Sequence, residues 1–318
     1  MPENNKKKKI TILFPTFNEL ENIKEIINQT FDYIRELTNY DFEILIIDNN
    51  SDDGTQEEIE QLAKQNKKLK IIINSRNFGP INSPTYGLLQ SDSDATIVLP
   101  ADFQHPLSLI PEYIKKWEQG NDVVLGKKTS SQENYLFYKI RSFYYKFLNN
   151  ISNVKPEENT NGEGLFDKKV IKLLKKINDP YPYFRGLIFE LGFKTCILEY
   201  KQNSRQKGWS KNNFFSLIDF FMLGMVKHSK LPLRIMSLAG FFFSFLFFLI
   251  SILFLILKLI YWNKFEFGLA PLMIGLFFMF SLVILILGVL GEYVIVLLAH
   301  IRNMPLVVEK KRINFDND

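Results

Sequence analysis

Two segments near the start of the sequence indicate what kind of sheet this protein builds: ITILFPTFNE at residues 10–19 and FEILIIDNNSDDGT at residues 42–55. Each begins with a short apolar run and ends in a polar cluster. Short apolar runs bounded by turn-forming residues are typical of buried strands. Between them, residues 21–37 carry apolar side chains at helical spacing. The pattern predicts two strands joined by a helix, which is the connection that parallel strands need.

The alternation of strands and helices continues along the first half of the chain. We expect further strands at 69–73, 95–99 and 122–125, and helices at 55–66, 83–89 and 107–119. This order predicts an α/β fold with a mostly parallel sheet covered on both faces, continued less regularly through residues 162–205. Ligands of such sheets bind at the carboxyl ends of the strands. Polar clusters lie at those ends, at residues 15–19, 48–54, 76–79 and 102–105.

The last third of the chain has a different composition. Over 318 residues, 47% are apolar and 23% charged, but residues 235–300 are almost free of charge. Residues 235–257 carry no charge and are long enough to cross a ~30 Å hydrocarbon core. Residues 267–299 are interrupted only by Glu292, and as one helix they would be about 50 Å long. We therefore expect the second span to end near residues 288–291, with residues 293–301 along the membrane surface.

These patterns divide the chain into five parts. We expect a soluble domain at 1–212, an interfacial amphipathic helix at 213–231, transmembrane helices at 232–260 and 267–291, and a juxtamembrane tail at 292–318. The helix at 213–231 could instead be a core helix of the soluble domain. Basic residues flank both outer ends of the hairpin, and the N-terminus has no signal-peptide pattern. We therefore expect the soluble domain and both termini on the cytoplasmic side of the plasma membrane.

Composition also excludes several kinds of site and partner. The single cysteine, Cys196, excludes an internal disulfide and a cysteine-rich metal site, and three scattered histidines argue against a zinc centre. A net charge of +5 suits anionic lipid or phosphate but is too small to indicate a nucleic-acid partner.

The polar clusters contain residue types that suit a nucleotide and a metal ion. Asp102 follows a predicted strand, and Gln104 lies two residues on. Carboxylate and amide oxygens suit Mg²⁺ or Mn²⁺ carrying a diphosphate. The first two clusters can bind a base and a ribose through hydrogen bonds. Alternatively they are ordinary turns and caps, with Asp53 in a turn and Asn18 or Ser51 capping a helix.

Taken together, the clusters resemble the family 2 glycosyltransferases of the GT-A fold, in the branch of dolichol-phosphate mannose synthase and the bacterial polyprenyl-phosphate glucosyltransferases. The matching motifs are PTFNE at 15–19, DNNSDDGT at 48–55, RNFG at 76–79, PADFQHP at 100–106, RGL at 185–187, GWSK at 208–211, GEY at 291–293 and RNMP at 302–305. The resemblance covers nearly the whole chain.

The resemblance implies transfer of one hexose, glucose or a related sugar, from a UDP- or GDP-linked donor to undecaprenyl phosphate with inversion. The product would supply a lipid-linked sugar for cell-envelope glycans. A homo-oligomer is compatible with this interpretation. The implied catalytic residues are Asp102, Gln104, Arg205 and Lys211, of which the first two hold Mg²⁺ or Mn²⁺. The implied donor-binding residues are Pro15, Phe17, Asn18, Glu19, Asp48, Asn50, Arg76, Gly79, Ala101 and Asp102.

The acceptor phosphate needs cations close to the membrane. Residues 135–150 combine aromatic side chains, which favour the interface, with Lys139 and Arg141. We expect these two to bind the phosphate together with Ser142 and with Lys128, which follows a predicted strand end. The alternative is a solvated basic face of an amphipathic helix.

Two departures from the family pattern affect the metal site. Pro100 stands where the family has the first aspartate of its D-x-D motif, and residues 161–165 (NGEGL) lack the acidic residue of the mannose synthase. Glu163 could replace it or be a loop residue only, and the departure favours the glucosyltransferase branch. Two rival functions are a non-catalytic membrane scaffold and a polysaccharide synthase. The second would need a Q-x-x-R-W motif and more spans, neither of which is visible.

Overall fold

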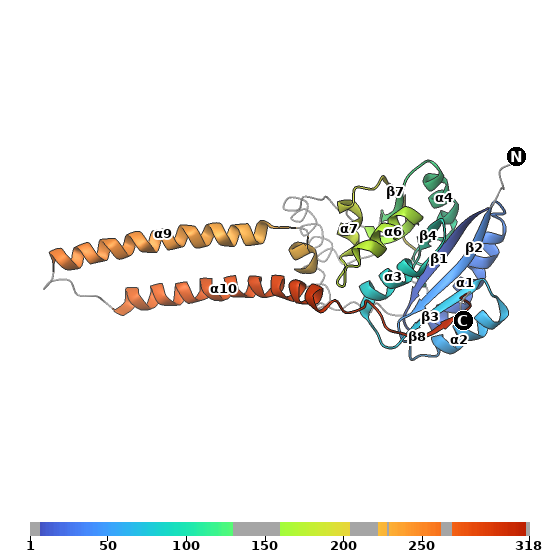
Figure 1. Cartoon of the computed structure of the whole chain (residues 1–318), viewed down its shortest axis with the longest axis horizontal. Coiled ribbons are helices and arrows are strands. Elements are labelled where there is room, and N and C mark those ends of the chain that lie inside the picture. The colour runs from blue at the N-terminus through green and yellow to red at the C-terminus, as the bar shows by residue number, and fades with distance from the viewer. Residues whose placement is uncertain (1–6, 130–159, 204–221, 228, 262–268, 316–318) are drawn as a thin grey trace.

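The structure is a computed structural model that describes residues 7–129, 160–203, 222–227, 229–261 and 269–315. An α/β domain forms one end of the molecule, and two long helices, α9 and α10, extend from it side by side (Figure 1).

One eight-stranded sheet forms the centre of the domain. Its strands are β1 (Lys8–Thr16), β2 (Tyr40–Asp48), β3 (Leu69–Asn74), β4 (Ala95–Val98), β5 (Val123–Lys128), β6 (Thr160–Asp167), β7 (Thr195–Tyr200) and β8 (Glu309–Ile313). They are ordered β7-β5-β6-β4-β1-β2-β3-β8. Neighbours are parallel except where β6 lies between β4 and β5, and where β8 pairs with β3. The predicted mostly parallel sheet is confirmed.

Helices cover both faces of the sheet, as the sequence predicts. They are α1 (Leu20–Arg35), α2 (Thr55–Gln65), α3 (Gly79–Gln90), α4 (Ile110–Glu118), α6 (Lys168–Ile177) and α7 (Phe184–Glu190). Alternate residues of a strand point to opposite faces. Ile12 of β1 therefore packs in a core with residues of α1, α2 and α4, whereas the next residue, Leu13, packs in a second core with α3, α6 and α7.

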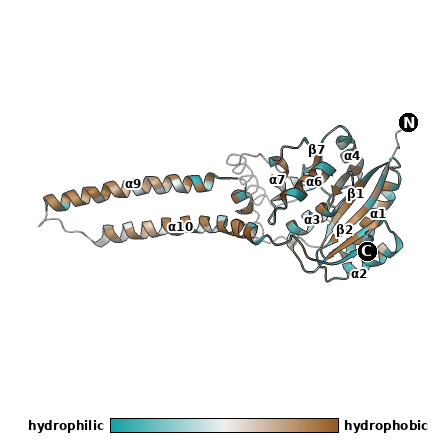
Figure 2. Cartoon of the chain, viewed as in Figure 1, coloured by the Kyte–Doolittle hydropathy of each residue, from teal (hydrophilic) through white to brown (hydrophobic). Residues whose placement is uncertain are grey.

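The two long helices, α9 (Leu231–Ile260) and α10 (Leu269–Arg302), are each long and apolar enough to cross a membrane. Figure 2 shows hydrophobic residues along most of their length. Their large side chains are exposed, for example Phe241 at 76% and Ile284 at 68%. Apolar surface of this extent indicates a lipid-facing surface.

The end of the second long helix differs from the prediction. α10 runs without a break through residues 288–291 to Arg302, so residues 293–301 are its last turns rather than a separate surface segment. Neither glycine in that stretch ends the helix, because apolar helix-forming residues surround them. The Tyr293 hydroxyl also donates to the Ser229 carbonyl at 3.0 Å, which ties the helix to the start of α9. The position of the membrane boundary along α10 stays a prediction.

The C-terminal segment is also more ordered than a juxtamembrane tail. Residues 309–313 form β8, which pairs antiparallel with the edge strand β3. The chain therefore leaves the domain through α9 and returns to the same sheet after α10 (Figure 1). Of the predicted interfacial helix at 213–231, residues 213–221 lie outside the described residues, and residues 222–227 are helical, with Leu223 and Val226 buried.

Candidate active site

A buried carboxylate lies at the carboxyl end of β2. Asp48 is fully buried and accepts hydrogen bonds from the backbone N–H of Ser51 at 2.9 Å and from its hydroxyl at 2.5 Å. Burial raises the pKa of Asp48 above its usual value, although the Ser51 hydrogen bonds oppose the shift. The carboxylate is therefore held in one orientation at the sheet edge.

The loops after β1 and β2 are locked together by side-chain hydrogen bonds. Asn18 has a left-handed backbone with φ 54°, and its N–H donates to the Ser51 hydroxyl at 2.8 Å. Its side-chain amide donates to the Asp52 carboxylate at 2.7 Å and accepts from the Asp52 N–H at 3.0 Å. Asp53 accepts from the N–H groups of Leu20 and Thr55, so it caps the first turns of both α1 and α2. The alternative role in caps and turns therefore applies to Asp53.

A third loop, residues 75–79, is fixed against the second by Asn49. The Asn49 side-chain oxygen accepts from the Phe78 N–H at 2.9 Å, and its amide donates to Asn77 at 2.8 Å. The Arg76 guanidinium lies over the Phe78 ring at 4.0 Å and remains exposed. Sequence reasoning missed Asn49, although it belongs to the same polar cluster as Asp48. This loop presents a cation beside the Asp48 loop.

The loop after β4 carries the predicted metal ligands. Asp102 is 5% exposed and accepts from the Gln104 N–H at 3.1 Å. Phe103, between them, has φ 60°, which is strained for an aromatic residue and is often seen at functional sites. Asn203, after β7, donates from its backbone to the Gln104 carbonyl at 3.2 Å and from its side chain to the Phe103 carbonyl at 3.4 Å. Asn203 therefore stabilises the strained conformation of this loop.

A cluster of hydrogen-bonded side chains packs next to this loop. His105 shares a hydrogen bond of 2.8 Å with the Tyr113 hydroxyl, and its other ring nitrogen lies 3.4 Å from the Glu163 carboxylate. The Tyr200 hydroxyl donates to the same carboxylate at 3.3 Å. Burial, and then the charge of Glu163, raise the pKa of both tyrosines, so they stay protonated at neutral pH. A Cβ at Gly126 would lie 2.5 Å from the Tyr113 oxygen, so glycine there makes room for the cluster.

Sheet register brings Glu163 next to the Asp102 loop. Gly164 of β6 pairs with Val98, the last residue of β4, so Glu163 lies just past the end of β4. It contacts His105 and Tyr200 and is therefore more than a surface loop residue. The described residues contain no group of three or more His, Cys, Asp or Glu that could hold a metal ion. Asp102 lies in this loop, and Glu163 contacts His105 at the end of it.

The structure gathers the predicted donor residues along one edge of the sheet. Parallel strands β2, β1 and β4 are neighbours, and the loops that follow them share that edge. These residues lie in these loops, in the loop after β3, or at the adjoining ends of β1, β2 and α3: Pro15, Phe17, Asn18, Glu19, Asp48, Asn50, Arg76, Gly79, Ala101 and Asp102. Lys128 ends β5, opposite Tyr200 of β7. Arg205, Lys211, Lys139, Arg141 and Ser142 lie outside the described residues.

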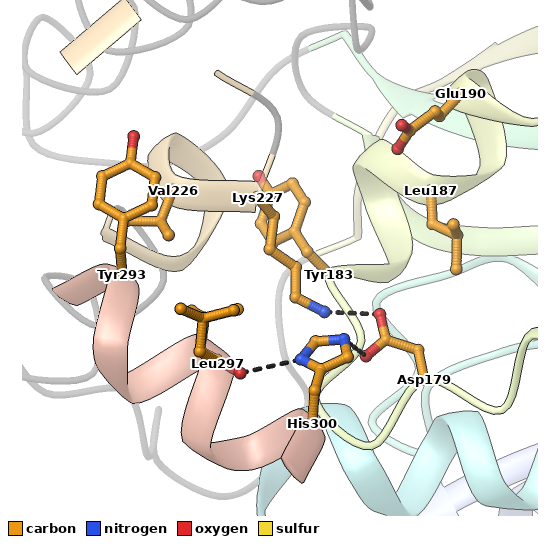
Figure 3. Close-up of a pocket in the computed structure, with 10 residues that line it drawn as sticks. Asp179, Tyr183, Leu187, Glu190, Val226, Lys227, Tyr293, Leu297 and His300 are labelled. Atoms are coloured by element: carbon orange, nitrogen blue, oxygen red, sulfur yellow. Dashed lines mark hydrogen bonds and ion pairs between the residues drawn. The ribbon is translucent and has the colours of Figure 1, made fainter. Parts of the chain in front are cut away.

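A pocket lies where α10 meets the α/β domain. It has a volume of about 320 Å³ and is lined by α7, the segment 222–227 and the end of α10 (Figure 3). Asp179 accepts from Lys227 at 2.5 Å and lies 3.4 Å from His300 of α10. Burial lowers the pKa of Lys227, and Asp179 opposes that shift. This ion-pair cluster joins the α/β domain to the membrane-proximal helices.

Comparison with known proteins places the chain in a known class of enzyme. Residues 11–191 match glycosyl transferase family 2, and the chain belongs to this family. It is 31% identical to the SfII prophage-derived bactoprenol glucosyl transferase of Shigella flexneri, over 95% of this chain and 98% of that protein. It is 30% identical to the putative glycosyltransferase CsbB of Bacillus subtilis, over 90% of this chain and 86% of that protein. The predicted glycosyltransferase class is confirmed.

Among solved structures, the chain is similar to the mannosyltransferase PcManGT from Pyrobaculum calidifontis in complex with GDP-Man and Mn²⁺. The TM-score is 0.46 with 16% sequence identity, over 70% of this chain and 63% of that one.

Proposed function

We propose that this enzyme transfers one glucosyl group from a nucleotide sugar to a polyprenyl phosphate at the membrane. One observation carries the proposal: similarity to a bactoprenol glucosyl transferase extends over 95% of the chain, and so includes both long apolar helices as well as the α/β domain. A soluble donor and a lipid acceptor need a catalytic domain that is anchored at the bilayer, and an α/β domain with two long apolar helices suits that need.

The donor binds at the edge formed by the loops after β1, β2, β3 and β4. Asp48, whose buried carboxylate is held by Ser51, fixes the loop that receives the base. The loop around Asn18 contacts the nucleoside, and Arg76 offsets charge on the diphosphate.

The residues near the Asp102 loop fit a divalent cation, Mg²⁺ or Mn²⁺. Such ions are commonly held by one or two carboxylates together with substrate phosphates. Asp102 supplies one carboxylate and Gln104 an amide oxygen. Glu163, from β6, supplies a second carboxylate in place of the acidic residue that the mannose synthase carries in this segment. When bound, the ion neutralises charge on the leaving diphosphate.

The chain's own residues then have to position two anions in line. A phosphate monoester is already anionic near neutral pH, so its oxygen attacks the anomeric carbon without a strong general base. The bond to the donor diphosphate breaks as the new bond forms, which inverts the anomeric centre. Rate enhancement therefore comes from orientation and electrostatics. Lys128, Lys139, Arg141 and Ser142 bind the acceptor phosphate, and Arg205 and Lys211 stabilise the leaving group.

The two long helices form a transmembrane hairpin in the plasma membrane, with the catalytic domain and both termini in the cytoplasm. Support comes from the return of the chain to the sheet as β8, which requires α9 and α10 to begin and end on the same side. Basic residues at both outer ends favour the cytoplasmic side.

The test uses purified full-length protein in detergent with undecaprenyl phosphate. UDP-glucose, UDP-galactose, UDP-N-acetylglucosamine and GDP-mannose are supplied separately with Mn²⁺, and lipid products are identified by mass spectrometry. A single hexose added to undecaprenyl phosphate from UDP-glucose supports the proposal. Absence of a sugar-lipid with every donor, or elongation to a polymer, contradicts it.

A further inference from the structure

The segment that follows α10 contacts one loop of the proposed donor site directly: the loop at residues 75–79, which carries Arg76 and is named the donor loop. After Arg302 the chain turns back to the domain, and Leu306 and Val307 are buried at 8% and 4% exposure. The Val308 carbonyl accepts a hydrogen bond from the N–H of Ser75 at 2.9 Å. Ser75 is the first residue after β3 and begins the loop that carries Arg76. The end of a membrane helix is therefore six residues away from a contact with this loop.

The same segment also holds the helix on the other side of the loop. α3 begins at Gly79, where the loop ends, and it carries Tyr86. The Tyr86 hydroxyl donates to the Glu309 carboxylate at 2.8 Å. Burial and the Glu309 carboxylate raise the pKa of Tyr86 to about 12, so this hydroxyl remains a donor at neutral pH.

Arg312 completes the connection between β8 and α3. Its Nε donates to Glu309 at 3.0 Å, and its guanidinium donates to Gln90, the last residue of α3, at 2.9 Å. The pairing of β8 with β3 shifts register between Ile73 and Asn74, immediately before the loop. Such irregularities bend a strand and redirect the chain that follows. One C-terminal segment thus contacts the start of the loop at residues 75–79 and the helix that follows the loop.

We propose that residues 306–312 are a positioning element of the donor site, which holds the Ser75–Gly79 loop and α3 in the arrangement that binds the nucleotide sugar. Tyr86, Glu309 and Arg312 are positioning residues, because they act on Arg76 and Gly79 through the backbone and do not touch the donor. The inference rests on the proposed function. It adds that membrane anchoring and donor binding share one segment of chain.

The test compares Tyr86→Phe and Glu309→Gln with a matched control, Lys311→Gln. Lys311 lies on the same strand but pairs at 2.7 Å with Glu60 of α2, away from the loop. KM for UDP-glucose, KM for undecaprenyl phosphate and kcat are measured for full-length protein in detergent. The first two variants should raise the donor KM roughly three- to tenfold. Their acceptor KM and kcat, and every constant of the control, should match the wild type.

A second measurement needs no ligand. Amide hydrogen exchange of residues 75–79 should be faster in Tyr86→Phe and Glu309→Gln than in Lys311→Gln, because the first two variants weaken the hydrogen bond that attaches α3 to β8. Unchanged donor KM and unchanged exchange would overturn the inference, as would an equal effect in all three variants. Failure of the proposed function is distinguishable, since the wild type would then form no sugar-lipid while the difference in hydrogen exchange persists.

Discussion

The substitution Glu163→Gln distinguishes two roles for this carboxylate: binding the metal ion, or supporting the structure only. The side chain is 20% exposed, accepts from the Tyr200 hydroxyl at 3.3 Å and lies 3.4 Å from His105. Glutamine has the same length and keeps one oxygen that can accept from Tyr200. The cost in folding free energy should therefore stay below about 1.5 kcal/mol, the range of a single net hydrogen bond.

The loss of activity should be larger than the loss of stability. If Glu163 helps Asp102 to hold the cation, the substitution removes one of two carboxylates near the loop. Changes to ligands or their supporting groups typically cost roughly 10- to 100-fold in metal affinity or activity. We therefore expect kcat/KM to fall by this factor at low Mn²⁺ and to recover in part at high Mn²⁺. Initial rates of sugar-lipid formation over a Mn²⁺ titration measure both effects.

Glu43→Gln is the matched control. Glu43 is a buried carboxylate on β2, five residues before Asp48, and it pairs with Lys9 at 2.8 Å and Lys70 at 3.0 Å. Its replacement removes the negative charge that Lys9 and Lys70 contact, so it should cost about 1–3 kcal/mol of stability and leave the Mn²⁺ dependence unchanged. Wild-type activity and Mn²⁺ dependence in Glu163→Gln would refute the role of Glu163 at the metal.

Three further predictions concern pH, topology and the acceptor. Burial alone would raise the pKa of Glu43, but its lysine and threonine partners lower the pKa overall. The stability that Glu43 contributes is therefore complete above the ordinary pKa of 4.5 and is lost as pH falls through the lower folded-state pKa. The free energies of unfolding of wild type and Glu43→Gln, measured by chemical denaturation, should converge in acid, and a constant difference would contradict this. A cysteine introduced by Asn263→Cys in a Cys196→Ser background should react with an impermeant thiol reagent in spheroplasts, and protection until lysis would reverse the predicted orientation. Replacing Lys139 and Arg141 together by glutamine should raise KM for undecaprenyl phosphate at least roughly tenfold with donor KM unchanged, and a rise in donor KM alone would remove them from the acceptor site.

The central part of the fold follows from the sequence because its strands are continuous apolar runs. Both faces of β1 are buried, with Ile12 in one core and Leu13 in the other, so the apolar run stands out from the polar loop that follows. Such loops carry the candidate donor residues. The sequence therefore places Asp48 and Asp102 at one edge without any knowledge of side-chain contacts.

Of the strands that lack this pattern, β6 and β8 do so for identifiable physical reasons. β6 contains Gly164, whose φ is 145° and where a Cβ would lie 2.1 Å from the Val124 carbonyl, so close approach to β5 requires a residue that breaks the apolar run. β8 has the sequence EKKRI, since it lies at the sheet edge, where charged side chains prevent pairing with other chains. The contacts of Glu163 and of Glu309 follow from these two strands and could not be predicted.

Hydrogen-bonded side chains within the site are also beyond sequence reasoning. The role of Asn49 in fixing the loop at residues 75–79 depends on the register of β2 and β3, and the support of Gln104 by Asn203 joins residues 99 positions apart. Neither relation leaves a periodic signal in the sequence.

The most direct test of the account is the lipid product itself. Full-length wild type and Asp102→Asn are reconstituted in liposomes that contain undecaprenyl phosphate, supplied with UDP-glucose and Mn²⁺, and the extracted lipids are analysed by mass spectrometry. Asp102 is 5% exposed and its substitution is nearly isosteric, so both proteins should fold, which thermal unfolding verifies. We expect undecaprenyl phosphate carrying one hexose from the wild type and a yield at least roughly 100-fold lower from the variant. Equal yields from the two proteins, or no glycosylated lipid from the wild type, would contradict it.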